Sequence, residues 1–101
     1  MRIPKKIKLL NQTIDIKIDN DFCDAKSVLG QANINHNEIV LCTRHEGRAV
    51  PVDRQAHTLM HELAHFIFFL VGRVDLYTDE LLADTFATIL HDLLENNNFK
   101  L

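Results

Sequence analysis

The sequence predicts a single α+β domain over residues 1–101, in which a small antiparallel sheet of two β-hairpins packs on a buried helix and on a second, C-terminal helix. Three observations predict this class. Apolar and charged residues alternate along the first part of the chain, with a period that is typical of half-buried strands. A predominantly apolar run from Leu59 to Val71 has the length of a helix. A further stripe of apolar residues recurs at helical spacing toward the C-terminus.

The composition is that of a small globular protein, with 47% apolar and 25% charged residues. These values argue against a disordered chain. A length of 101 residues suffices for one hydrophobic core with little to spare. The net charge of −3 offers no basic surface for nucleic acid, so we expect no nucleic-acid partner.

Neither a secretion signal nor a membrane span is expected. The N-terminus, Met1–Lys6, runs into an alternating pattern instead of an apolar core. The longest apolar run is too short to cross a bilayer and contains charge. We therefore expect no membrane partner and a cytoplasmic location, where Cys23 and Cys42 would be free thiols. A disulfide between them is the alternative.

The segment Ile3–Ile18 predicts the first hairpin. Ile7 and Leu9 alternate with lysines, and after Asn11–Gln12 three isoleucines alternate with charged residues. This gives a period of two on both sides of a turn. We interpret the lysines as the solvated face of an edge strand rather than as a basic patch.

Residues 20–31 leave two possibilities open, a bulged loop and a short helical turn. A second hairpin is predicted next, because Ala32–Asn35 and Glu38–Cys42 flank a turn at His36–Asn37. Successive residues of its second strand are apolar and point to opposite faces, so we expect this strand to be covered on both sides.

A long helix should follow the polar loop Thr43–Val52. Asp53 is its expected N-cap, and the helix should run to Val71 with Gly72 as the C-cap residue. The polar loop would then lead directly into this helix.

The last helix is predicted over residues 79–95, with Thr78 as its cap. The small Ala83 and Ala87 would let it approach the preceding helix closely. Its apolar stripe is expected to belong to the core and comprises Leu81, Leu82, Phe86, Ile89, Leu90, Leu93 and Leu94.

The long helix contains the motif H-E-x-x-H, formed by His61, Glu62 and His65. The four-residue spacing places both imidazoles on one helix face, with their side chains starting about 5–6 Å apart. Two such imidazoles can reach one zinc ion, which binds histidine nitrogen at about 2.0–2.1 Å. Glu62 leans to the side of that face, where its carboxylate can act as general base on a metal-bound water. Satisfied core histidines are the alternative, but burying these groups without partners is costly.

A catalytic zinc needs a third protein ligand. The best candidate is Glu80, on the last helix. Asp84 follows it by four residues on the same face, and is therefore a candidate hydrogen-bond partner for the ring of His61 or His65.

Two further histidines are considered as ligands. His57 continues the histidine column but lies about 12 Å from His65 along the helix axis, so we expect it to neighbour the cleft. His91 lies about 16 Å from Glu80 along its own helix and would matter only if Glu80 were not the ligand.

The segments Gln55–His65 and Asp79–Ala87 resemble the ImmA/IrrE-type zinc metallopeptidases, in particular short single-domain members from phages and other mobile elements. The pattern of that family is H-E-x-x-H followed by E-x-x-A-[DN]-x-F-A. The N-terminal opening and the two hairpins also resemble such phage proteins.

This resemblance implies a minimal zincin-like fold. It implies one Zn²⁺ per chain with His61, His65 and Glu80 as ligands, and Glu62 as the catalytic base. It also implies that the partner is a protein substrate, often a regulatory protein such as a repressor, in the bacterial cytoplasm.

From these residues we expect zinc-assisted hydrolysis of a peptide bond in a protein or peptide. The strand Glu38–Cys42 is expected to accept an extended substrate at the sheet edge. Tyr77 or His45 is expected to stabilise the oxyanion or to contact the substrate. Two other classes stay open: a zinc-binding regulatory module with little or no activity, and a helical core without metal.

Overall fold

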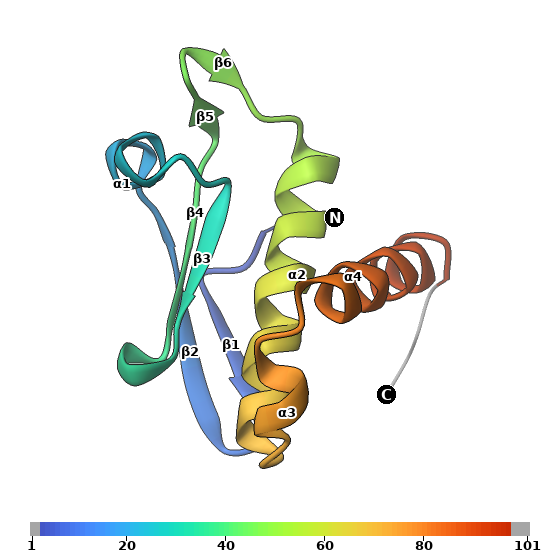
Figure 1. The fold of residues 1–101 in the computed structure, drawn as a ribbon. Helices are drawn as coiled ribbons and strands as arrows, with labels where there is room; N and C mark the ends of the chain where they lie inside the picture. Colours follow the sequence, from blue (N-terminus) through green and yellow to red (C-terminus); the bar gives the residue numbers. More distant parts are fainter. Residues whose placement is uncertain (1–2, 98–101) are drawn as a thin grey trace.

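The computed structural model describes residues 3–97. A four-stranded sheet, helix α2 and helix α4 form three successive layers, with α2 in the middle (Figure 1). The elements are, in chain order, β1 (Lys6–Leu9), β2 (Gln12–Ile18), α1 (Asn20–Lys26), β3 (Gly30–Asn33), the 3-10 turn η1 (Ile34–His36), β4 (Glu38–Leu41), β5 (Arg44–His45), β6 (Arg48–Ala49), α2 (Val52–Leu70), α3 (Val74–Tyr77) and α4 (Glu80–Glu95).

Both predicted hairpins are present, but the sheet that they build is mixed. β1 pairs with β2 and β3 pairs with β4 in antiparallel registers, whereas β2 and β4 run parallel, with Asp15 opposite Glu38. The expectation of an antiparallel sheet is therefore wrong. The chain crosses over through α1 and returns first as β3, so that β4 is the strand inserted beside β2 (Figure 1). The order β1-β2-β4-β3 makes β3 an edge strand and β4 an inner one.

The segment after β2, for which a loop and a helical turn were both open, forms helix α1. The Asp19 carboxylate caps it by accepting a hydrogen bond of 3.0 Å from Phe22 N. Ser27 ends it in the left-handed conformation, at φ 55°. α1 buries Cys23 in one cluster with Cys42, and both are free thiols as expected. Burial raises the pKa of the Cys23 thiol to about 12, so it stays protonated at neutral pH.

The main core fills the space between the sheet, α2 and α4. Its buried members are Ile14, Ile39, Leu41, Leu59, Met60, Leu63, Phe66 and Ala87. On the opposite face of β4, Val40 belongs to a second cluster with Cys42 and Val50, because alternate residues of a strand point to opposite faces. β4 is thus covered on both sides, as its sequence predicted.

The two long helices lie close to their predicted positions, but their N-caps differ from those expected. α2 begins directly after Pro51, whose φ of −58° suits a helix start, and Asp53 lies inside the first turn. α4 is capped by the Asp79 carboxylate, which accepts a hydrogen bond of 2.9 Å from Leu82 N, and not by Thr78. A carboxylate is the stronger acceptor of the two neighbours. None of the helices in residues 3–97 is both long and apolar enough to cross a membrane.

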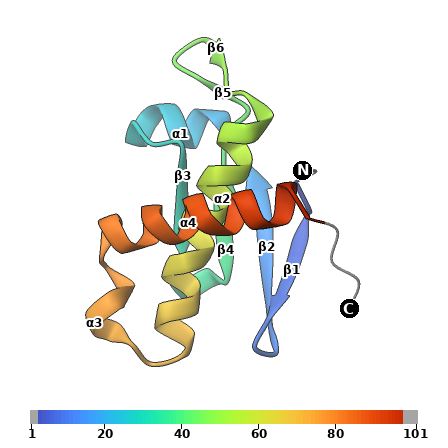
Figure 2. The same ribbon diagram turned by 90° about the vertical axis from the view of Figure 1, so that its right-hand side faces the viewer.

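Only a narrow face of α4 is buried, so the expectation that its whole apolar stripe belongs to the core is wrong. Ala83 and Ala87 are fully buried, whereas Leu81 and Ile89 are 79% and 64% exposed. α4 crosses α2 as the outermost layer (Figure 2), so no described element covers its outer face. The exposed leucines and isoleucine of α4 are Leu81, Ile89, Leu93 and Leu94.

β3 approaches α2 closely at Gly30, and this contact predicts a measurable effect on stability. A Cβ atom at position 30 would lie 2.6 Å from Thr58 Cγ2 and 3.0 Å from Val40 O. We expect Gly30→Ala to lower the free energy of unfolding by about 1–3 kcal/mol, because overpacking displaces β3 from the helix. Urea denaturation followed by circular dichroism measures this loss.

Gly47→Ala is the matched control. Position 47 has open space around it and a φ of +81°, so an alanine there should cost only backbone strain of about 1 kcal/mol. The loss at position 30 should exceed the loss at position 47. The opposite order would contradict the close approach of β3 to α2.

Candidate metal centre

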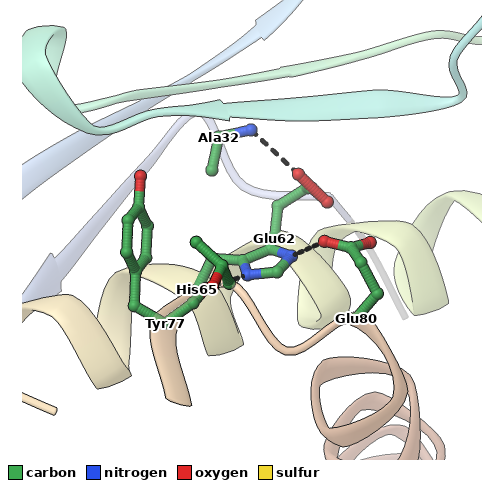
Figure 3. A pocket seen from close by; sticks show the side chains of 6 residues that line it. Ala32, Glu62, His65, Tyr77 and Glu80 are labelled. Carbon is green, nitrogen blue, oxygen red and sulfur yellow. Dashed lines mark hydrogen bonds and ion pairs between the residues drawn. The ribbon is translucent and has the colours of Figure 1, made fainter. Parts of the chain in front are cut away.

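Helix α2 directs neighbouring side chains of the motif to two different layers. His61 and His65 are four residues apart, so they lie on one face, with ring centroids 5.1 Å apart. Glu62 points to the sheet instead, where it meets Ala32 of β3 (Figure 3). The middle layer of the fold thus supplies side chains to both of its neighbours.

The third member of the group comes from the first turn of α4. Glu80 directs one oxygen to each ring: Oε2 lies 3.0 Å from His61 Nε2, and Oε1 lies 2.8 Å from His65 Nε2. Asp79 starts α4 at this point, and the small Ala83 lets α4 lie close to α2. Donor atoms of the three residues lie within 4.8 Å of one another, so they could hold one metal ion. We call His61, His65 and Glu80 the first ligand group.

The hydrogen bonds at the other ring nitrogens determine what these imidazoles present to Glu80. His65 Nδ1 lies 2.6 Å from the carbonyl oxygen of Tyr77. Because a carbonyl can only accept, this Nδ1 must carry a proton, and a neutral ring then has a lone pair at Nε2. His61 repeats the arrangement, with Asp84 Oδ1 3.3 Å from its Nδ1.

A lone pair that faces a carboxylate is repelled unless a positive charge lies between them. Two protons, one on each ring, or a single divalent cation would supply that charge. Two imidazolium rings with centroids 5.1 Å apart repel each other, whereas one dication is shared by both rings and the carboxylate. The first ligand group therefore fits a metal ion, and two imidazole nitrogens with one carboxylate form a donor set that zinc accepts.

Asp84 holds a second histidine besides His61. Its Oδ1 lies 3.0 Å from His57 Nε2, and the hydrogen bonds to His57 and then to His61 lower the pKa of the Asp84 carboxyl. The structure thus brings Asp84 to His61, one of the two partners considered for it. The carbonyl of Tyr77 takes the corresponding place at His65. His57 neighbours the first ligand group through Asp84.

Glu62 is buried beside the first ligand group rather than inside it. Its Oε1 accepts a hydrogen bond of 2.9 Å from Ala32 N, and its Oε2 lies 3.8 Å from His61 Nε2. Burial raises the pKa of the Glu62 carboxyl, against the opposing effect of His61 and His65. A carboxylate in this position can reach a water molecule at the ligand group and exchange a proton with it.

Two cavities adjoin Glu62, and the edge strand β3 borders both. The larger, about 430 Å³, is lined by Gly30 and Gln31 of β3 together with Arg54 and His57 of α2. The smaller, about 200 Å³, is shown in Figure 3 and is lined by Ala32, Glu62, His65, Tyr77, Thr78 and Glu80. β3 therefore runs along the first ligand group from one cavity to the other.

Of the two residues considered for the oxyanion or the substrate, the structure brings only Tyr77 to the site. Its ring centroid lies 6.4 Å from that of His65, and its hydroxyl points toward β3 (Figure 3). His45 lies on the β5–β6 ribbon, where its Nδ1 is 3.3 Å from Asp24 Oδ1. It lines neither of the two cavities, because its ribbon packs on α1.

The expectation that Glu38–Cys42 offers the substrate edge is wrong, because β4 is paired on both sides. β3 is the edge strand at the site, and its Ala32 supplies the backbone N–H that holds Glu62. No signal in the sequence marks Ala32, since its role comes from the main chain and not from its side chain. The role of Ala32 depends on β3 being the edge strand. Predicting it would first require predicting that β4 pairs in parallel with β2.

Comparison of the chain with protein-family models, with curated proteins and with solved structures finds no match. The geometry of the site therefore carries the functional interpretation.

The raised pKa of Glu62 predicts a pH-dependent stability of the metal-free protein. The folded state favours the protonated carboxyl, so this contribution is fully present below the ordinary glutamate pKa and is lost as pH rises through the raised value. Glu62→Gln keeps an acceptor for Ala32 N–H but cannot ionise. We expect the variant to flatten the dependence of the free energy of unfolding on pH, with its largest advantage over wild type on the alkaline side.

Urea titrations of both proteins with a chelator present, from about pH 4 to about pH 8, measure this difference. Parallel curves for wild type and Glu62→Gln would contradict a raised pKa at this position.

The contact between Asp84 and His61 predicts a loss of metal affinity on substitution. Asp84→Ala leaves all three ligands in place but removes the acceptor that orients the ring, so zinc affinity should fall about 10–100-fold. Competition with a chromogenic chelator measures the affinity. Asp21→Ala removes the same charge from the first turn of α1 and should leave the affinity unchanged. Equal losses in both variants would show that only net charge matters.

Proposed function

We propose that this chain is a zinc-dependent peptidase, with one Zn²⁺ per chain bound by His61, His65 and Glu80 and with Glu62 as the general base. The observation that carries the proposal is that both Nε2 atoms converge on one carboxylate while each Nδ1 already faces an acceptor. Three protein ligands leave a fourth position for water, which is the pattern of catalytic rather than structural zinc sites.

The proposal includes a minimal zincin-like architecture and a place among the ImmA/IrrE-type peptidases that the two helical motifs resemble. Its support is the order of the elements: a helix with H-E-x-x-H lies against a sheet, and a glutamate opens the next long helix. A regulatory protein of a phage or another mobile element, cut in the bacterial cytoplasm, is the partner that this resemblance suggests.

A zinc ion in the first ligand group would lower the pKa of a bound water to about 7 and polarise the carbonyl of a peptide. Glu62 would transfer a proton from the attacking water to the leaving nitrogen, in two steps. Its carboxylate takes the proton of the attacking water as the oxygen adds to the peptide carbon. It returns a proton to the amide nitrogen as the C–N bond breaks, which leaves a carboxylate and an amine. The raised pKa of Glu62 suits both steps, because a base with a pKa nearer neutrality is also a usable acid.

An extended protein segment is the substrate class that fits the site. β3 is an edge strand whose outer main-chain groups pair with no described strand, and it borders both cavities. A segment added to this edge would carry its scissile carbonyl past Glu62. Tyr77 lines the smaller cavity with its hydroxyl toward β3, so it is placed to contact such a segment (Figure 3).

His61→Ala tests metal binding. Purified wild-type protein should contain about one zinc per chain, and His61→Ala should lose it, because two ligands do not hold a catalytic zinc. Atomic emission after gel filtration measures the metal. His36→Ala removes a histidine from η1 and should leave the metal content unchanged. Wild-type protein that purifies without metal and takes up no zinc would exclude both the peptidase and the zinc-binding module.

Glu62→Gln separates a peptidase from a zinc-binding module with little or no activity. The variant should keep its zinc, while its rate of peptide cleavage should fall about 10²–10⁴-fold with the loss of the base. Incubation with a pool of proteome-derived peptides, followed by mass spectrometry, detects cleavage at any sequence that the pool contains. Glu46→Gln alters an exposed glutamate of the ribbon and should cleave like wild type.

Two results would count against the roles assigned to these residues. Unchanged cleavage by Glu62→Gln would remove Glu62 as the base. Zinc-loaded wild-type protein that cuts no peptide in the pool would favour the zinc-binding module.

A further inference from the structure

Helices α2 and α4 carry a second group of metal-ligating side chains, which shares no residue with the first. Asp53 lies in the first turn of α2, and His91 and Glu95 lie four residues apart near the end of α4. Donor atoms of the three residues lie within 4.8 Å of one another. His91, considered from the sequence only as a substitute for Glu80, therefore belongs to a separate group of ligands.

His91 is the member whose surroundings indicate a missing partner. Its Nε2 is buried and has no hydrogen-bond partner in the described part of the chain. Glu95 Oε1 lies 3.6 Å from this nitrogen, which is beyond hydrogen-bond distance. This ring nitrogen has lost its hydration, and the longer ion-pair contact with Glu95 compensates it less well than a hydrogen bond would. A cation between His91 and the two carboxylates would satisfy it.

The charges around this group favour a cation. Asp53, Asp92 and Glu95 place acidic side chains around a cavity of about 400 Å³ that His91 also lines. The C-terminal end of α4, near His91 and Glu95, is the negative end of the helix dipole and attracts positive charge.

Two basic side chains face the same region and are the competitors of a metal ion. His57 lines the cavity, but its Nε2 is engaged by Asp84 Oδ1 at 3.0 Å. Arg54 lines an adjoining cavity together with Asp53 and His91. The Glu95 carboxyl also has a charged hydrogen-bond partner already, which lowers its pKa. A metal ion would therefore have to compete for Glu95 as well as with the Arg54 guanidinium near Asp53.

We propose that Asp53, His91 and Glu95 bind a second divalent transition-metal ion. One imidazole nitrogen with two carboxylate oxygens is a mixed donor set that Zn²⁺, Mn²⁺ and Ni²⁺ accept, whereas Mg²⁺ prefers oxygen alone. Both carboxylate residues are exposed, so this site is open to water and binds more weakly than the first ligand group. The inference does not depend on the proposed peptidase activity.

The test uses the full chain with His61→Ala and His65→Ala, which dismantles the first ligand group and leaves the second intact. Calorimetric titration with zinc chloride should show about one zinc bound per chain. Adding His91→Ala should weaken this binding at least about tenfold, since the loss of even an outer hydrogen-bond partner costs that much. Adding His36→Ala instead is the matched control and should change nothing.

Two further measurements keep the proposal testable if a variant folds poorly. Asp53→Asn keeps the side-chain volume and should also weaken binding, with circular dichroism as the check on folding. Wild-type protein titrated beyond its first zinc should take up a second, and proton–nitrogen correlation spectra should then show a shift of the His91 Nε2 resonance.

No zinc uptake by the double variant and by wild type beyond its first zinc would overturn the proposal. So would uptake that neither His91→Ala nor Asp53→Asn weakens. Either result would leave His91 and Glu95 as an ordinary ion pair one helical turn apart. A failure of the first ligand group to bind zinc would not affect this outcome, because that group is absent from the tested variant.

Discussion

The Glu80 carboxylate, which faces one imidazole with each of its oxygens, is the contact on which the rest of the site depends. α2 alone can bring His61 and His65 to one face, but it cannot complete a coordination shell. α4 supplies the missing oxygen because Asp79 begins the helix at that point and because Ala83 lets the two helices lie close together. Small residues and a helix cap, rather than extensive apolar contact, thus bring the three donors together.

The layered arrangement also places the side chains of one short motif in two different environments. Consecutive residues of a helix are rotated by about 100°, so His61 and Glu62 point to different layers. The histidines face α4, where ligands converge, while Glu62 faces β3 and is held by the main chain of Ala32. The candidate metal ligands and the proposed base are therefore positioned by different parts of the fold, and the burial that raises the pKa of Glu62 comes with its place under the sheet.

The hairpins, the long helices and the convergence of His61, His65 and Glu80 could be predicted because their signals are local. Period, spacing and capping residues are read within a few positions of the chain. The order of the strands is not local: the pairing of Asp15 with Glu38 joins segments on either side of α1 and β3, and no pattern in either segment specifies it. That pairing decides which strand borders the site. Periodicity also marks an apolar helix face without showing whether a further layer covers it, which is why Leu81 and Ile89 were expected in the core.

The narrow contact of α4 has a consequence for motion. Its fully buried side chains are two alanines, so the hydrophobic effect holds it far less firmly than α2, which contributes Leu59 and Phe66 to the core. An element attached in this way can detach as a separate cooperative unit while the sheet and α2 stay folded, and its amide protons then exchange through that local opening. A cation bound between the two imidazoles of α2 and Glu80 of α4 would stabilise the docked position of α4. The ligand atoms of His61, His65 and Glu80 would then determine both the chemistry of the site and the time that α4 stays docked on α2.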